Sequence, residues 1–450
     1  AARRSPQFGI PVAEVMGYFI SRASLGSLTA KSGLGTALPL PREAMAQFAA
    51  QTNFDPATLP ANLFLTAAVY AGGDPSFVQV PADADAATQR WDPATFDRAL
   101  LVPANAFTGI KEVEWAKRFS IDDYALPGDS FTGFVLIEQA KAEANLLVEQ
   151  LLGHDGLFAG RDRDGNRLAP TALDQVAGLW LLTDLAGILA DSRYARYGDP
   201  VAAERFRTLA DRAFAASRTL PPTSTVDSAL AVEAYGQYAA VTADAERRQE
   251  ALGAIEPLGD VLAAAQPAET AELGAALYGL VEASRVTGRA SLLDAASTHF
   301  LELEARWDST ARVYATTVGA ASYTYTPLEV GLVLAGLNAL RIFGPPSVAE
   351  LAQSRLADFF ENSILVSGMQ LASSLGVQHP ALVAPAQAGG PYGRAPVLAS
   401  QVTYDLSTCT WTVTDARFTT FWDMFLSNQA FWLSRRVVDG FIPVANIPGA

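Results

Sequence analysis

The stretch Ser224–Ala265, "STVDSALAVEAYGQYAAVTADAERRQEALGAIEPLGDVLAAA", contains two consecutive helical patterns of different character. In both halves apolar residues recur three and four positions apart, which predicts α-helices near 225–242 and 246–265. The first half is rich in alanine and tyrosine, whereas the second carries most of the charge. Because a helix that is apolar on most sides is buried, this pair is typical of a hairpin with one inner and one outer helix.

The same alternation continues along most of the chain. We expect long helices near 131–152, 171–191, 200–219, 225–242, 246–265, 269–287, 291–305, 327–343, 347–361 and 420–437. The helices of inner character begin near 171, 224, 268, 326 and 420, so the repeat is loose. Repeats of this kind predict a mainly α fold, either a solenoid or a closed ring of helical hairpins.

The first 130 residues differ from the rest because they are rich in proline and contain only short apolar runs. Short helices are expected near 11–25, 42–51 and 59–70, joined by irregular segments. We therefore divide the chain into a Pro-rich, partly helical N-terminal segment (1–130), packed on the body, and a helical-hairpin domain (131–450). An insertion near 365–415 contains "QVTYDLSTCTWTVTD", whose alternation predicts a β-hairpin with Cys409 on its apolar side as a packed structural thiol.

The composition argues against several classes of function. The 450-residue chain has a formal net charge of −15, and its basic runs, such as Arg3-Arg4 and Arg435-Arg436, are no longer than two residues, so neither nucleic acid nor an anionic membrane surface is expected as a partner. No segment has the roughly 18 uninterrupted apolar residues of a membrane span. One cysteine and three scattered histidines rule out an internal disulfide and disfavour a metal or haem site, so no cofactor and no metal is expected.

The start of the sequence bears on location and assembly. The first residue is not methionine and lysine is scarce. Both features are compatible with a processed protein that is extracellular, periplasmic or at the cell surface. The long Pro-rich segment is also of a kind that can wrap a neighbouring subunit, so an oligomer formed through this segment is one alternative.

The stretch "GRDRDGNR" (160–167) allows two interpretations. Asp162, Asp164 and Asn166 are spaced by two, as in a calcium-binding loop. With Gly165 at the sixth position of such a loop, both end ligands are missing. The alternative is a tight Asp-Gly turn in a short hairpin at 156–168, and turn chemistry favours it.

Acids at helix starts are explained first by capping. A Ser or Thr followed three residues later by an acid is a capping-box pattern, which satisfies free backbone N–H groups. The pairs are Thr171 with Asp174, Ser224 with Asp227, Thr326 with Glu329, Thr420 with Asp423 and, in "FSIDDYALPGDS", Ser120 with Asp123. Repetition favours helix initiation over catalysis, although an acid at the end of an inner helix can also line the mouth of a ring.

Acids inside the inner helices are harder to explain. By helical direction, Asp184 lies on the apolar face of its helix near Trp180, Glu282 stands in the same relation to Tyr278, and Glu233 has a matching position. We take these three acids as catalytic candidates, since burial raises the pKa of a carboxyl and suits a general acid. Trp180, Tyr278 and Tyr235 are candidates for packing on sugar rings. The alternative is that the acids are hydrogen-bonded or paired structural carboxylates.

The alternating helices and the "GLF…DG…LDQVAGLW" lead-in resemble the (α/α) toroid, or six-hairpin, superfamily over about residues 131–437. The resemblance implies a ring of helical hairpins around a central funnel. Many members are glycoside hydrolases, polysaccharide lyases or sugar epimerases that use carboxylates or His/Tyr pairs in this funnel, and others are non-catalytic. Scarce histidine weakens the epimerase and lyase alternatives, and no catalytic residue is carried over from the resemblance.

Two functions therefore stay open. The first is a glycan-directed protein, a glycoside hydrolase with two carboxylates in the funnel, whose separation would predict the stereochemical outcome. The second is a non-catalytic cell-surface or assembly protein, favoured by the missing catalytic motif and by the long N-terminal segment. A fold alone does not decide between them.

Overall fold

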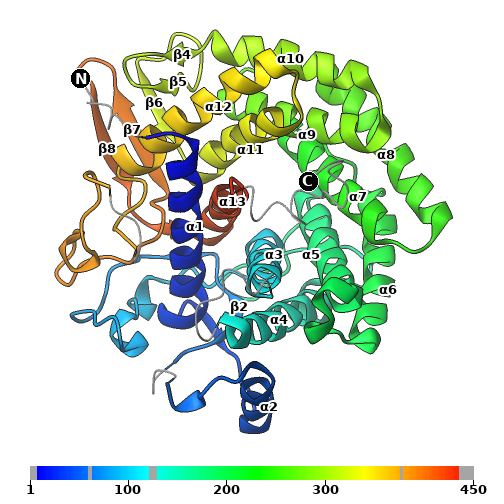
Figure 1. The fold of residues 1–450 in the computed structure, drawn as a ribbon, viewed down its shortest axis with the longest axis vertical. Coiled ribbons are helices and arrows are strands. Elements are labelled where there is room, and N and C mark those ends of the chain that lie inside the picture. The colour runs from blue at the N-terminus through cyan, green and yellow to red at the C-terminus, as the bar shows by residue number, and fades with distance from the viewer. Residues whose placement is uncertain (1–7, 59–62, 121–128, 375–378, 435–450) are drawn as a thin grey trace. The chain divides into compact units, whose positions relative to one another are not determined.

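The computed structural model describes residues 8–58, 63–120, 129–374 and 379–434, and Figure 1 labels its helices and strands. The chain forms two compact units. Unit 1 consists of residues 1–24, 222–388 and 396–450, and unit 2 of residues 25–221 and 389–395. Each unit is built mainly from helices, as the sequence predicts.

The helices of unit 1 form two layers. α7, α9, α11 and α13 follow one another as neighbours, and α8, α10 and α12 pack on their outer side (Figure 1). The bounds are α7 (Thr225–Val241), α8 (Ala245–Ala264), α9 (Thr270–Thr287), α10 (Ala290–Glu304), α11 (Pro327–Phe343), α12 (Pro346–Phe360) and α13 (Thr420–Phe431), preceded by α1 (Ile10–Gly26). The inner helices are buried over most of their length, which confirms the predicted alternation.

Unit 2 contains a smaller set of packed helices. α3 and α5 are neighbours, α4 packs on both, and α6 packs on α5. The bounds are α2 (Arg42–Thr52), α3 (Val102–Phe119), α4 (Asp129–Leu146), α5 (Ala172–Ala190) and α6 (Pro200–Ser217). A short antiparallel pair joins β1 (Gly35–Ala37) to β2 (Thr66–Val69).

Two expectations for the first 130 residues are wrong. Residues 66–69 of the expected helix at 59–70 form strand β2, and residues 59–62 lie outside the described part of the chain. The segment 102–119 is the long helix α3, whose polar residues, such as Lys111 and Glu114, are buried together with its apolar ones, so that no exposed face sets them apart. The division of the chain at residue 130 stays a prediction, although α3 packs on α4 and α5.

The predicted β-hairpin is present and gains a third strand. β7 (Gln401–Asp405) pairs with β8 (Thr410–Asp415) and with β6 (Ser322–Tyr325), which leads directly into α11. The expectation that Cys409 packs on the apolar side is wrong, because the residue is exposed. It ends the turn with a φ of 53°, and the strand alternation begins one residue later. A further pair joins β4 (Trp307–Asp308) to β5 (Val313–Tyr314).

The 160–167 stretch forms the tight turn. The Asp162 carboxylate accepts hydrogen bonds from the Asp164 and Asn166 backbone N–H groups (3.0 and 2.8 Å) and from the Asn166 side-chain amide (3.0 Å). These hydrogen bonds lower the pKa of Asp162, and the bond from the Asn166 side chain has the largest effect. Gly165 takes the positive φ of 86° that the turn requires.

Three of the four caps predicted at inner-helix starts are confirmed. Capping boxes join Thr171 to Asp174 and Thr326 to Glu329, and the Ser224 hydroxyl accepts from the Asp227 N–H at 3.0 Å. The fourth is wrong: α13 begins at Thr420 itself, and Asp423 accepts from the Leu398 N–H at 2.8 Å instead. Asp123, expected to pair with Ser120, lies outside the described residues.

Glycine sets the spacing of α9 and α11. A Cβ atom on Gly336 would lie 2.5 Å from the Gly274 carbonyl oxygen, and one on Gly274 would lie 2.7 Å from the Leu332 carbonyl oxygen. No side chain fits between backbones at this distance. The two helices therefore pack backbone to backbone.

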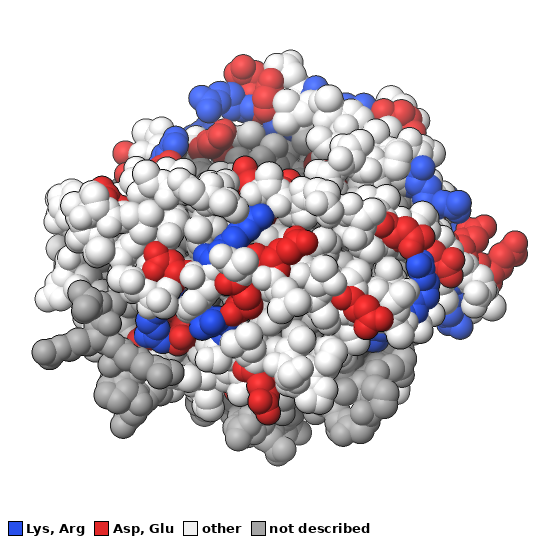
Figure 2. Space-filling model, turned by 90° about the horizontal axis from the view of Figure 1, so that it is seen from above, with Lys and Arg blue, Asp and Glu red and all other residues white. Residues whose placement is uncertain are grey.

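Charged side chains of both signs are mixed on the face shown in Figure 2, and the one described helix long and apolar enough to span a membrane is buried. On the face drawn in Figure 2, Lys and Arg side chains lie beside Asp and Glu instead of gathering in a basic patch. Among the described helices, α5 is long and apolar enough by composition to cross a membrane, but 83% of that stretch is buried inside the structure. Such burial is typical of a core helix.

Replacing Thr326 by alanine is expected to lower the free energy of unfolding by about 1 kcal/mol, because the start of α11 loses its cap. Chemical denaturation measures the change. Thr298→Ala, in the middle of α10, is the control and should cost nothing, since alanine favours helix. Equal free energies of unfolding for the Thr326 variant and the wild type would show that Thr326 does not stabilise the start of α11.

Gly336→Ala is expected to destabilise the protein by about 1–3 kcal/mol through overpacking against Gly274. Helix propensity alone predicts the opposite sign, a gain of about 1 kcal/mol. Gly253→Ala on α8 is the matched control, because a Cβ there meets no atom within 4 Å. Thermal unfolding should separate the two variants in opposite directions, and a stabilised Gly336 variant would refute the close packing.

Candidate functional site

The six residues predicted from the sequence are all buried, each at most 5% exposed, but they lie in two separate units. Asp184 and Trp180 belong to α5 in unit 2. The others lie in unit 1, with Glu233 and Tyr235 on α7 and Tyr278 and Glu282 on α9. The structure therefore brings part of the predicted set together in unit 1.

In unit 2, Asp184 lies close to a buried cation. Lys117 on α3 forms an ion pair with Glu114, with 2.8 Å between Nζ and Oε1. Burial on its own would lower the pKa of Lys117, but the negative charges of Glu114 and Asp184 outweigh it and raise this pKa. Lys117 thus stays charged beside two carboxylates. Trp180 on the same helix packs edge-on against Phe107, with 5.8 Å between ring centroids.

In unit 1, Glu282 is held by an arginine one turn further along α9. The Arg285 Nη2 and Nε atoms donate to the two Glu282 carboxylate oxygens at 2.6 and 2.8 Å. Burial raises the pKa of Glu282, and the hydrogen bonds and charge of Arg285 act against this rise. A bidentate pair of this kind fixes the carboxylate in both position and charge.

Glu233 faces this pair from α7 in a different environment. Both its carboxylate oxygens are buried and lack a hydrogen bond of ordinary geometry among the described residues. The Tyr278 hydroxyl lies against the carboxylate only as a weak donor. Burial first, and then the negative charge of Glu282, raise the pKa of Glu233 well above its ordinary value. The protonated acid is therefore favoured.

Tyr278 connects the two acids to a third helix. Its phenol is neutral at physiological pH, because burial, Glu233 and Glu282 all raise the pKa of Tyr278. Gln429 of α13, which is 3% exposed, lies near the phenol and lowers its pKa, although the Gln429 amide nitrogen has no hydrogen bond of ordinary geometry among the described residues. We call Glu233, Tyr278, Glu282, Arg285 and Gln429 the acid cluster. It places two carboxyls in unlike surroundings, an arrangement that commonly separates an acid from a base.

Sequence reasoning missed a second pair of buried acids. Glu112 on α3 and Glu143 on α4 are both 0% exposed, and neither carboxylate has a hydrogen-bond partner among the described residues. Burial raises the pKa of both, and the charge of Glu112 raises that of Glu143 further. The run "KEVEWAKRF" could have revealed Glu112, because it places several charged residues in a helix that has no exposed face.

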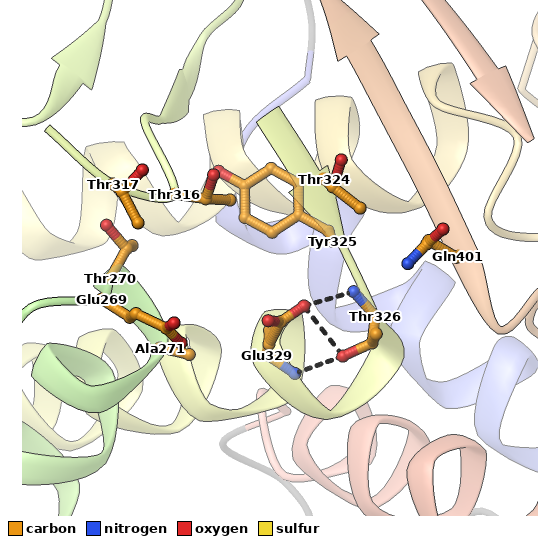
Figure 3. Close-up of a pocket in the computed structure, with 10 residues that line it drawn as sticks. All are labelled: Glu269, Thr270, Ala271, Thr316, Thr317, Thr324, Tyr325, Thr326, Glu329 and Gln401. Carbon is orange, nitrogen blue, oxygen red and sulfur yellow. Dashed lines mark hydrogen bonds between the residues drawn. The ribbon is translucent and has the colours of Figure 1, made fainter. Parts of the chain in front are cut away.

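An open pocket lies elsewhere in unit 1, at the starts of α9 and α11 (Figure 3). It holds about 230 Å³. Its lining is Glu269, Thr270, Ala271, Thr316, Thr317, Thr324, Tyr325, Thr326, Glu329 and Gln401. The sequence predicted that Glu329 caps a helix. It did not indicate that Gln401, on β7, lines the same pocket. Burial raises the pKa of Glu329, hydrogen bonds from Thr326 lower it, and the charge of Glu269 raises it.

The comparisons with known proteins concern the fold. No protein-family model and no curated protein matches this chain. Among solved structures, it is similar to the cellulase Cel9M of C. cellulolyticum, at 10% identity and a TM-score of 0.52, over 94% of this chain and 98% of that one. It is also similar to cellobiose 2-epimerase from Bacillus thermoamylovorans B4167, at 12% identity and a TM-score of 0.51, over 87% of this chain and 98% of that one.

These similarities show which fold the chain has. The fold is that of the (α/α) toroids, mainly helical with a few small antiparallel sheets, as the resemblance of the sequence implied. At this level of identity they define the fold alone. The sequence-predicted site residues thus stay predictions.

Glu233→Gln is expected to become more stable relative to the wild type as the pH rises. A carboxyl with a raised folded-state pKa contributes stability that is fully present below the unfolded pKa, about 4.3 for Glu, and is lost as pH rises through the folded pKa. The glutamine amide of the variant does not titrate, so the variant does not lose stability in this way as the pH rises. Melting temperatures measured from about pH 4 to pH 9 test this.

The matched control for this experiment is Glu256→Gln, at an exposed position of α8. Its difference from the wild type should stay constant across the pH range. A constant difference for the Glu233 variant as well would mean that Glu233 is ionised in the folded protein.

Proposed function

We propose that this protein is a glycan-directed protein outside the cytoplasm, a glycoside hydrolase in which Glu233 and Glu282 form the acid pair. One observation carries the proposal: two buried carboxyls on neighbouring inner helices have unlike environments, since Glu233 lacks a hydrogen bond of ordinary geometry among the described residues and Glu282 is fixed by Arg285. The fold supports it, because the cellulase and the cellobiose 2-epimerase have the same architecture.

The environments suggest a role for each acid. Glu233, with its raised pKa, holds a proton that it can donate to a glycosidic oxygen as general acid. Glu282, ion-paired with Arg285, is the carboxylate that activates water or attacks the sugar directly. Tyr278, a neutral phenol between them, can donate a hydrogen bond to a sugar hydroxyl.

The other predicted residues remain part of the proposal. Asp184 is the third catalytic candidate, and its negative charge is one of those that raise the pKa of Lys117. Trp180 and Tyr235 have the ring faces that pack on sugars, and both are buried. A ligand reaches these rings only if the surrounding side chains move.

The same burial favours a second candidate function. An ion pair within one helix, as between Glu282 and Arg285, and a carboxylate beside Lys117 are also what structural networks contain. In this alternative the protein is a non-catalytic surface or assembly protein, and its Pro-rich N-terminal segment contacts a neighbouring subunit.

A panel of oligosaccharides incubated with the purified protein tests the proposal. Cleavage is followed by mass spectrometry of the products, and binding by calorimetry. Glu233→Gln is expected to lower kcat by about 10²–10⁴-fold, the usual contribution of a general acid, because an amide cannot donate the proton. Glu256→Gln, exposed on α8, should retain full activity.

Two results would overturn parts of this proposal. Full turnover by a folded Glu233→Gln variant would move the acid role to Asp184 or another carboxyl. Neither cleavage nor binding of any oligosaccharide by the wild type would favour the assembly alternative.

A further inference from the structure

We infer that the pocket at the starts of α9 and α11 is a binding site for one uncharged sugar ring. This inference rests on the proposed glycan function and names the class of ligand for a place separate from the acid cluster. The pocket is lined mainly by hydroxyl and amide groups drawn from two helices, a loop and two strands (Figure 3).

The pocket offers hydrogen-bonding atoms that the fold leaves uncommitted. Gln401 uses its Oε1 atom to accept from the Thr414 hydroxyl at 3.1 Å, which leaves its NH₂ group free among the described residues. In Figure 3 this nitrogen points toward Thr326. Glu329 uses Oε2 to accept from the Thr326 N–H and hydroxyl at 2.6 and 2.9 Å, which leaves Oε1 as an acceptor. Among the described residues, the pocket thus offers one free donor, at Gln401, and one free acceptor, at Glu329.

Three threonines add groups that adapt to a ligand. Thr316, Thr317 and Thr324 line the side of the pocket nearest the Tyr325 ring in Figure 3. A hydroxyl group both donates and accepts, and its hydrogen rotates to suit the partner. A sugar ring presents the same alternation of donors and acceptors around its edge. The lining therefore matches vicinal hydroxyls better than a purely accepting or purely donating ligand.

The charge of the lining selects against anions. It contains two carboxylates, Glu269 and Glu329, and no Lys, Arg or His. A phosphate or a uronic acid would meet like charge with no cation to offset it, and like charges at short range cost free energy. The ligand is therefore an uncharged ring.

Size and rigidity limit the ligand to one ring. The volume of about 230 Å³ is below the roughly 300–1,000 Å³ of pockets for larger ligands. Tyr325 supplies an apolar wall, and its hydroxyl donates to the Tyr314 carbonyl, which fixes the ring. The Thr270 N–H donates to the Thr316 carbonyl at 3.0 Å, which ties the loop to α9. The site is thus formed before a ligand arrives.

Titration calorimetry with D-glucose, D-glucosamine and D-glucuronate, on the full chain, tests the inference. We expect a Kd for glucose on the order of 1 mM, which corresponds to about −4 kcal/mol. Glucuronate should bind at least tenfold more weakly. Gln401→Leu should weaken glucose binding at least tenfold, whereas Gln249→Leu, exposed on α8, should leave it unchanged. If Gln401→Leu fails to fold, Thr316→Val replaces it.

Several outcomes would overturn the inference. These are no glucose binding, glucuronate binding as tight as glucose, tenfold tighter glucosamine binding, or unchanged affinity in a folded Gln401 variant. The proposed function is judged separately, by oligosaccharides and Glu233→Gln. If the wild type and the Gln401 variant bind or cleave oligosaccharides equally well, the pocket fails and the glycan function stands.

Discussion

Backbone contact between α9 and α11 is the constraint on which the rest of unit 1 depends. With Gly274 and Gly336 in contact, no side chain separates the two helices, and their polar residues must point elsewhere. The first turns of both helices then lie side by side and bring Glu269 and Glu329 to one pocket. Further along α9, the same fixed spacing holds the acid cluster against α7 and α13.

The inner helices carry carboxyl groups at their starts and deeper along their length, and the free-energy cost of burying these groups differs between the two places. At the helix starts, the Asp174 and Glu329 carboxylates accept from backbone N–H groups, and these bonds offset their partial burial. Deeper in α9, desolvation of Glu282 is offset by the bidentate contact with Arg285. Glu233 has no comparable compensation, and protonation is the route by which it avoids burying a charge.

The sequence predicts the helices because their periods and caps are local. α11 follows from Thr326, Pro327 and Glu329 alone. The buried helix α3 lacks an exposed face, and Cys409 ends the turn although strand alternation places it in the strand, so both features were missed. Helical direction found Glu233 and Glu282. It could not find Gln429 or Gln401, since each arrives from a distant segment, and tertiary packing alone decides such contacts.

Because of the buried acids Glu112 and Glu143, unfolding of unit 2 exchanges hydrogen ions with the solvent. Burial raises the pKa of both in the folded protein, so near neutral pH they bind hydrogen ions more strongly there than in the unfolded chain. Unfolding therefore liberates hydrogen ions, and a buffer must take them up. The heat absorbed on melting then includes the ionisation enthalpy of that buffer, so calorimetric enthalpies from phosphate and Tris solutions differ by an amount that counts these hydrogen ions.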